Sequence, residues 1–125
     1  MGIDFTNKKI FKLNREELKN ALPVVTKLLT EGEMVIDSYV SMRDRVVFTN
    51  KRVIAVNVQG LTGTKKCFTS IPYNKIQFYS VETSGTLDLD AELELYLAGG
   101  MNVKFEFFGK NNIQELCKII SDLIL

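Results

Sequence analysis

The chain has 125 residues, of which 46% are hydrophobic and 25% are charged. This length and composition are typical of one globular domain that buries a core. The 16 basic and 15 acidic residues leave a formal net charge of +1, so no overall field attracts the chain to nucleic acid or to anionic lipid. Histidine is absent, which excludes Ser-His and Cys-His nucleophile pairs within one chain.

The sequence carries no membrane or export signal. No apolar run approaches the roughly 20 residues of a membrane-spanning helix, and residues 1–12 lack the apolar stretch of a signal peptide. We therefore expect a cytoplasmic protein without a transmembrane segment. Cys67 and Cys117 are expected to be reduced thiols in the core, and a disulfide between them stays open. We expect no metal and no cofactor, since two cysteines are too few for a closed zinc site.

The first third of the chain carries leucines at intervals close to those of a helix. Asn14 is suited to cap such a helix, and Glu17 three positions later would complete a capping box. Pro23 should interrupt the pattern, because proline lacks the N–H that a helix interior needs. We expect one helix over residues 15–22 and a second over residues 24–29.

The period of the apolar residues then changes to two, which is the spacing of strands. In the clearest segment, Glu92, Glu94 and Tyr96 alternate with leucines. Turn residues such as asparagine and glycine separate most of the segments. The seven strands are expected at residues 34–42, 45–49, 52–58, 65–71, 75–82, 92–97 and 103–108.

The last segment returns to helical spacing, with apolar residues on one face and charged residues on the other. We expect an amphipathic helix over residues 112–125, capped at Asn111 or Asn112, that covers an open end of the β-structure. Its apolar positions are Ile113, Leu116, Cys117, Ile120, Leu123 and Ile124.

Four segments of the sequence, in order, resemble the signature of bacterial pleckstrin-homology-like domains. Several such segments in order are more specific than any one motif. The segments are residues 43–54 (RDRVVFTNKRVI), 59–63 (QGLTG), 70–73 (SIPY) and 82–93 (ETSGTLDLDAEL).

The resemblance implies a mostly β fold with α, in which seven antiparallel strands form a two-sheet sandwich or barrel capped by a C-terminal α-helix. Residues 33–125 would form this domain, and residues 1–32 would be an N-terminal helical extension outside the common core. The family also implies a cytoplasmic protein of unassigned function and cyclic, ring-like self-assembly.

A basic cluster is expected where strands meet at one end of the meander. Arg43 and Arg45 stand two apart on one strand face, and Lys65 and Lys66 follow a turn at the same end. Such a cluster can hold a phosphate or carboxylate. The alternative is a solvated strand end, with Asp44 offsetting part of the charge.

Carboxylates alternate with apolar residues from Asp88 through Asp90 and Glu92 to Glu94. Four carboxylates on one strand face can bind a hard cation or form an acid-base pair. The regular apolar row between them favours an outward polar face instead.

Phe107 and Phe108 are neighbours on the last expected strand, so their rings must point to opposite faces. An outward phenylalanine there is a candidate contact with another subunit, and both residues are candidates. The resembling segments, the missing histidine and the surplus aromatic residues favour a non-catalytic interaction module that assembles with itself, and the resemblance implies a cyclic homo-oligomer. The alternative is a lipid- or anion-binding domain that contacts a membrane peripherally through the basic cluster. A small hydrolase that uses Cys67 or the carboxylate row is a third possibility, although no histidine is present to activate the thiol.

Overall fold

A computed structural model describes residues 9–125 except 43, 60, 62–64, 84 and 86–88, and the side chains of residues 9–11 and 59 are likewise not described. The described residues form one sheet of eight strands and two α-helices, joined in places by short 3-10 turns. In chain order the elements are β1 (Lys9–Arg15), α1 (Leu18–Val25), β2 (Val35–Val40), β3 (Arg45–Thr49), β4 (Arg52–Gln59), β5 (Lys65–Pro72), β6 (Phe78–Thr83), β7 (Ala91–Tyr96), β8 (Asn102–Phe108) and α2 (Ile113–Ile124). The 3-10 turns are Thr26–Leu28, Tyr73–Lys75 and Ala98–Gly100.

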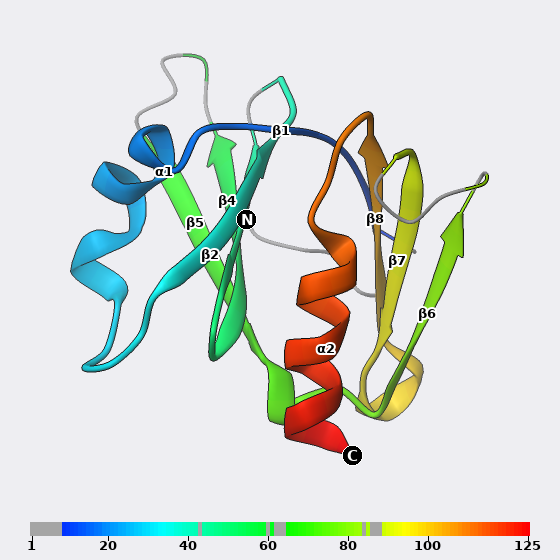
Figure 1. Ribbon diagram of the computed structural model, residues 1–125. Coiled ribbons are helices and arrows are strands. Elements are labelled where there is room, and N and C mark those ends of the chain that lie inside the picture. The colour runs from blue at the N-terminus through cyan, green and yellow to red at the C-terminus, as the bar shows by residue number, and fades with distance from the viewer. Residues whose placement is uncertain (1–8, 43, 60, 62–64, 84, 86–88) are drawn as a thin grey trace.

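The strands follow the order β5-β4-β3-β2-β1-β8-β7-β6 in a single ladder. The sheet curls, so that its two halves stand on either side of α2 (Figure 1). The seven strands expected from sequence are present as β2 to β8. The expected division into two sheets is not found, because β1 pairs antiparallel with β2 and parallel with β8 and so joins the two halves.

No strand was expected before residue 34, but residues 9–15 form a strand in the middle of the ladder. Two neighbouring strands offer β1 backbone partners on both sides, and Leu13 is fully buried in the core beneath it. Asn14 does not cap a helix, because it pairs with Val40 in the ladder. The division of the chain at residue 32 stays a prediction, although β1 lies before that residue and belongs to the sheet.

The single helix α1 replaces the two helices expected around Pro23, which lies inside it. Proline removes one hydrogen bond from a helix interior, and α1 ends two residues later at Val25. The chain then tightens into the 3-10 turn Thr26–Leu28. The expected break therefore falls after Pro23 as a change of helix type.

The main core fills the concave side of the curled sheet. Four aromatic rings meet there, and the ring centroid of Tyr39 lies 4.5 Å from that of Phe107 and 5.8 Å from that of Phe48. The predicted amphipathic helix is confirmed as α2, which closes this side with Ile113, Leu116 and Ile120. Full burial of each such side chain contributes about 1.5–3 kcal/mol.

A second apolar layer lies on the convex side, where α1 covers β3 and β4. Ala21 and Val25 of α1 pack against Val47, Ile54 and Val56. The strands β3 and β4 are therefore buried on both faces. This explains why their sequences are continuous apolar runs rather than alternating ones.

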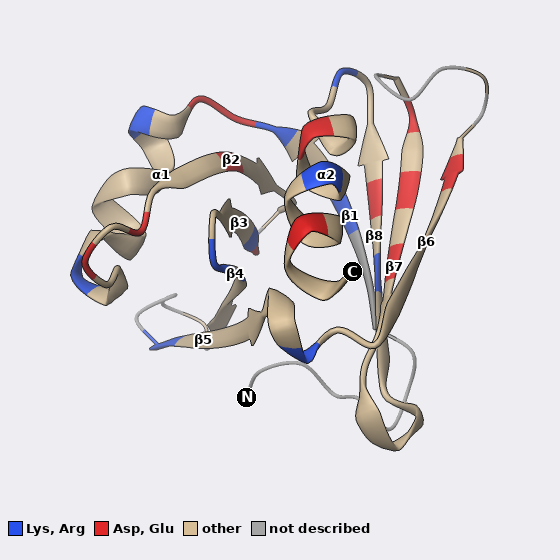
Figure 2. Cartoon of the chain, turned by 60° about the horizontal axis from the view of Figure 1, so that its bottom comes forward, with Lys and Arg blue, Asp and Glu red and all other residues tan. Residues whose placement is uncertain are grey.

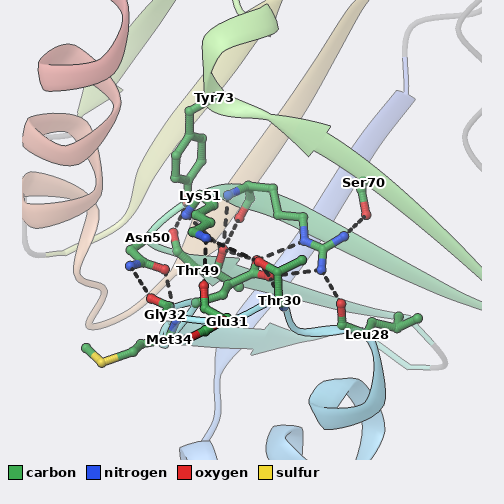
Figure 3. Close-up of polar contacts among 12 residues, drawn as sticks. Leu28, Thr30, Glu31, Gly32, Met34, Thr49, Asn50, Lys51, Ser70 and Tyr73 are labelled. Carbon is green, nitrogen blue, oxygen red and sulfur yellow. Dashed lines mark hydrogen bonds and ion pairs between the residues drawn. The ribbon is translucent and has the colours of Figure 1, made fainter.

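A partly buried ion pair between Arg52 and Glu33 fixes the loop after α1 to the sheet (Figure 3). Arg52 Nε lies 2.8 Å from Glu33 Oε2, and Nη2 donates to Glu33 Oε1 at 3.0 Å and to the Leu28 carbonyl at 2.6 Å. Thr49 Oγ1 and the Thr30 N–H also donate to the carboxylate, at 2.7 Å and 2.9 Å. Burial alone would raise the pKa of Glu33, but these donors outweigh it and lower the pKa to about 2. The Glu33 carboxylate accepts hydrogen bonds from several donors of the same chain, so its role is structural.

A second buried polar group ties the start of α2 to β2. The Tyr39 hydroxyl donates to Asp37 Oδ2 at 2.7 Å and accepts from the Asn112 N–H at 2.9 Å. Arg15 at the end of β1 donates to Asp37 Oδ1 at 3.0 Å. Burial raises the pKa of Tyr39 well above that of free tyrosine, so the hydroxyl keeps its proton and the bond to Asp37.

Candidate functional site

The strands β6, β7 and β8 present a set of charged side chains on the face that points away from the core. Glu82 lies opposite Glu92, which lies opposite Glu106, and in the next row Glu94 lies opposite Lys104. The residues that alternate with these on β7 and β8 are buried in the core, so the charged set points outward. We call Glu82, Glu92, Glu94, Lys104 and Glu106 the acidic face (Figure 2).

The acidic face carries an electrostatic cost. Like charges directly opposite each other on neighbouring strands destabilise a sheet, and three glutamates form such a row here. Lys104 offsets part of the repulsion, with Nζ 3.3 Å from Glu92 Oε2. Its hydrogen bond with Glu92, and then the charges of Glu94 and Glu106, raise the pKa of Lys104. Glu94 is only 9% exposed and accepts a hydrogen bond from Asn102, so Glu82, Glu92 and Glu106 carry the accessible negative charge. With one lysine among these glutamates, the face is negative and suited to a positively charged partner.

A shallow depression of about 240 Å³ lies at one end of the acidic face, beside Phe108. Phe108 is 44% exposed, so its ring is available for contact. Phe107 is only 2% exposed, and its ring packs against Tyr39 in the core. Strand alternation therefore turns the Phe107 side chain inward and the Phe108 side chain outward, and a contact with another subunit stays a prediction. Phe108 remains the candidate.

The other end of the acidic face is aromatic. Phe78 of β6 stacks on Tyr96 of β7 with ring centroids 4.2 Å apart and planes 7° from parallel. Phe78 is 55% exposed. Exposed aromatic rings thus border the acidic face at both ends. Aromatic residues are enriched in the contact surfaces between proteins. Sequence analysis missed this pair, because the rings become neighbours only through the β6–β7 register.

The structure brings only part of the expected basic cluster together. Arg45 and Lys66 line one small depression of about 130 Å³, together with Asp44. Lys65 directly precedes Lys66 on β5, so its side chain points to the opposite face of the sheet. Arg43 lies outside the described residues. The guanidinium of Arg45 is paired with Glu16, at 2.5 Å between Nε and Oε2, so its charge is already engaged.

The carboxylate row expected from residue 88 to residue 94 is only partly described, since Asp88 lies outside the described residues. Asp90 accepts a hydrogen bond from the Gly109 N–H, and Glu94 accepts one from Asn102 Nδ2. Within the described chain, no group of three or more His, Cys, Asp and Glu residues is placed to hold a metal ion.

The two cysteines and the helices were considered for thiol chemistry and for membrane insertion. Cys67 and Cys117 are separate free thiols. Burial raises the pKa of the Cys117 thiol to about 11, against a smaller opposite effect of Tyr79. Among the described residues, no helix has the length and apolar character that a bilayer span requires.

An open, curled β-sheet closed by one C-terminal helix defines the structural class, and comparisons with known proteins identify the family. The sequence profile of the bacterial PH domain family matches residues 4–124. The chain belongs to this family of pleckstrin-homology (PH) domains, as the resemblance of its sequence segments predicted.

Two uncharacterized proteins of Bacillus subtilis (strain 168) are relatives. YjqA is 42% identical over 96 residues, which cover 75% of this chain and 77% of YjqA. YozO is 28% identical over 94 residues, which cover 75% of this chain and 81% of YozO.

Two solved structures agree with the fold. A DUF1696 family protein with a pleckstrin-homology domain from Shewanella loihica PV-4 superposes with a TM-score of 0.73 at 32% identity, covering 92% of this chain and 99% of its own. A pleckstrin homology domain from Shewanella amazonensis SB2B gives a TM-score of 0.60 at 34% identity, covering 88% of this chain and 90% of its own.

Proposed function

We propose that this PH domain is a non-catalytic interaction module that assembles with copies of itself into a closed ring. The observation that carries the proposal is the acidic face with its exposed Phe108. Its repulsive glutamate row is relieved if a neighbouring subunit brings positive charge, and the aromatic ring supplies apolar contact.

The same chain offers a basic counterpart at the other end of the sheet. Lys65 and Lys66 are exposed at the start of β5, one on each face of the sheet, and β5 is the strand farthest from β6 in the ladder. Two different and complementary patches on one chain support head-to-tail contacts between copies. Such contacts close into a ring when the rotation between subunits permits it.

A non-catalytic role agrees with the chemistry of the side chains. The chain has no histidine to act as a general base at neutral pH. The Cys117 thiol, with its pKa raised to about 11, stays protonated and is a poor nucleophile. The free state of both cysteines fits a reducing compartment, which supports a cytoplasmic location.

A charge-swap experiment tests the assembly. One variant carries Lys65→Glu and Lys66→Glu, and the other carries Glu92→Lys and Glu106→Lys. Light scattering and native mass spectrometry should show oligomers for the wild type and mainly monomers for each variant alone. An equal mixture of the two variants should regain oligomers, because each then offers the charge that the other lacks.

Phe108→Glu should also weaken the assembly, and Lys27→Glu, an exposed reversal outside both patches, should leave it unchanged. A wild type that stays monomeric over a wide concentration range would refute self-assembly. Variants that assemble as well as the wild type would refute this interface.

The second candidate function is anion or lipid binding at the basic cluster. The supporting observation is that Arg45 and Lys66 share one depression. Pelleting with anionic vesicles tests it: wild-type binding that Lys66→Glu abolishes would support this function, and the absence of wild-type binding would reject it.

A further inference from the structure

A groove of about 490 Å³ runs between β6 and α2, away from the acidic face. Tyr79 and Val81 from β6 and Cys117 from α2 supply its apolar lining, which we call the floor. The polar lining comes from α2 and consists of Gln114, Lys118, Ser121 and Asp122. The Tyr79 hydroxyl lies 2.6 Å from Ser121 Oγ and 3.4 Å from the Cys117 carbonyl, so β6 and α2 are held at a fixed separation. The groove is therefore built into the fold and needs no rearrangement to form.

The strand that borders this groove is an open edge of the sheet. In the ladder of the described strands, β6 pairs with β7 on one side and is terminal on the other (Figure 1). Its free backbone N–H and C=O groups are the groups to which another extended chain can add.

The two edges of the sheet differ in how they discourage added strands. The edge strand β5 begins with Lys65 and Lys66 and ends at Pro72, and both lysine and proline discourage pairing. The sequence of β6, FYSVET, contains neither lysine nor proline. The β6 edge thus stays open beside an apolar groove, whereas the β5 edge is guarded.

Two charges on α2 define the rim of the groove. Lys118 and Asp122 line it one helical turn apart, and both side chains are exposed. Among the described residues, no salt bridge joins either of them to a partner. An occupant gains most if it carries an acidic group near Lys118 and a basic group near Asp122.

We propose that the β6–α2 groove binds an extended peptide segment of another protein, which adds to β6 as a further strand. Alternate side chains of a strand point to one face, so every second residue of the peptide enters the groove. The apolar floor selects apolar residues at those positions, and the rim selects one acidic and one basic residue beside them. This site is independent of the proposed ring, since it uses the edge of β6 and not the outward face.

A selection from displayed random peptides provides the probe. Peptides selected on the wild-type protein should share apolar residues at alternate positions with an acidic residue at a constant offset. Binding of one synthetic selected peptide is then measured by calorimetry. Hydrogen exchange should show protection of the β6 amides that face away from β7 when the peptide is bound.

Two further measurements make the test specific. Methylation of alternate backbone nitrogens of the peptide should abolish binding in one of the two registers only, because a strand donates to its neighbour from every second residue. Lys118→Glu should weaken binding on the order of tenfold and Asp122→Lys similarly, since each removes one charge pair and adds repulsion. Exchange of the acidic peptide residue for lysine should restore binding to Lys118→Glu. Glu115→Lys, an exposed reversal on α2 outside the groove, should change nothing.

Three results would overturn the proposal. One is a selection that yields no binding peptide, and another is binding that neither methylated register reduces. The third is protection of the free β6 amides in the assembled protein without peptide, which would assign the groove to a second copy of the chain. None of these results depends on whether the ring forms through the acidic face.

Discussion

The Arg45 guanidinium donates two hydrogen bonds to the Glu16 carboxylate, one to each carboxylate oxygen. Arg45 Nε lies 2.5 Å from Glu16 Oε2, and Arg45 Nη2 lies 3.1 Å from Glu16 Oε1. Ser38 Oγ donates to the same carboxylate at 2.5 Å. A phosphate or carboxylate ligand would use the same fork, so Glu16 acts as an internal competitor for it.

Glu16→Gln should therefore increase binding to anionic vesicles, because it releases the charge of Arg45 beside Lys66. It should also destabilise the fold by about 1–3 kcal/mol, since a charge-assisted hydrogen bond in a partly buried pair is lost. Vesicle pelleting and denaturant unfolding measure the two effects. Glu17→Gln is the matched control, because Glu17 is exposed and pairs only with Lys19 among the described residues. Equal binding by Glu16→Gln and the wild type would show that Arg45 does not take anions.

The Glu33–Arg52 pair should make the stability of the protein depend on acid. The pKa of Glu33 is lowered from 4.5 to about 2 in the folded chain. A lowered pKa adds stability that is present above pH 4.5 and is lost as the pH falls toward 2, and this shift corresponds to roughly 3 kcal/mol. Glu33→Gln should remove this part of the pH dependence and lower stability at neutral pH.

Urea unfolding at several pH values between 2 and 7 measures this effect. Glu31→Gln is the control, since its side chain is exposed next to the ion pair. If the wild type and Glu33→Gln lose stability in parallel as the pH falls, the pair does not stabilise the fold in this way.

The strands and the closing helix could be predicted because their side-chain periods differ. Alternation with period two marks β7 and β8, and apolar positions three and four apart mark α2. The strand β1 escaped this approach because its partners are distant in sequence: Phe11 pairs with Phe105 and Asn14 with Val40. A short segment whose pairing is set by the rest of the sheet carries little periodic signal of its own.

The candidate site depends on the pairing register of the strands, which could not be predicted from the sequence pattern. The row of Glu82, Glu92 and Glu106 exists only because three strands align at one position, and a shift by one residue would turn each side chain to the other face. The ion pair of Arg45 could not be predicted either, because its partner Glu16 directly follows the unpredicted strand β1. The continuous apolar runs in β3 and β4 indicated that both faces of these strands are buried. The helix α1 packs on one of the two faces.

The two adjacent phenylalanines of β8 should respond very differently to truncation. Phe107→Ala removes a buried ring from the core and should cost about 3–5 kcal/mol of stability. Phe108→Ala removes an outward ring and should change the stability of the monomer by less than about 1 kcal/mol. Thermal and denaturant unfolding, under conditions that keep the protein monomeric, measure both. Similar losses for the two variants would contradict the inward and outward assignment of these rings.

The Cys117 thiol on the floor of the β6–α2 groove should react slowly. Burial raises its pKa from 9.0 to about 11, so at pH 8 its thiolate fraction is about 100-fold below that of an unperturbed thiol. In a Cys67→Ser background, alkylation followed by mass spectrometry should give a rate that rises tenfold per pH unit until about pH 11. The same protein unfolded in urea supplies the unperturbed rate. Equal rates in the folded and unfolded states would show that the floor of the groove is open to reagents. A further decrease in the folded rate when a selected peptide is present would place that peptide over Cys117.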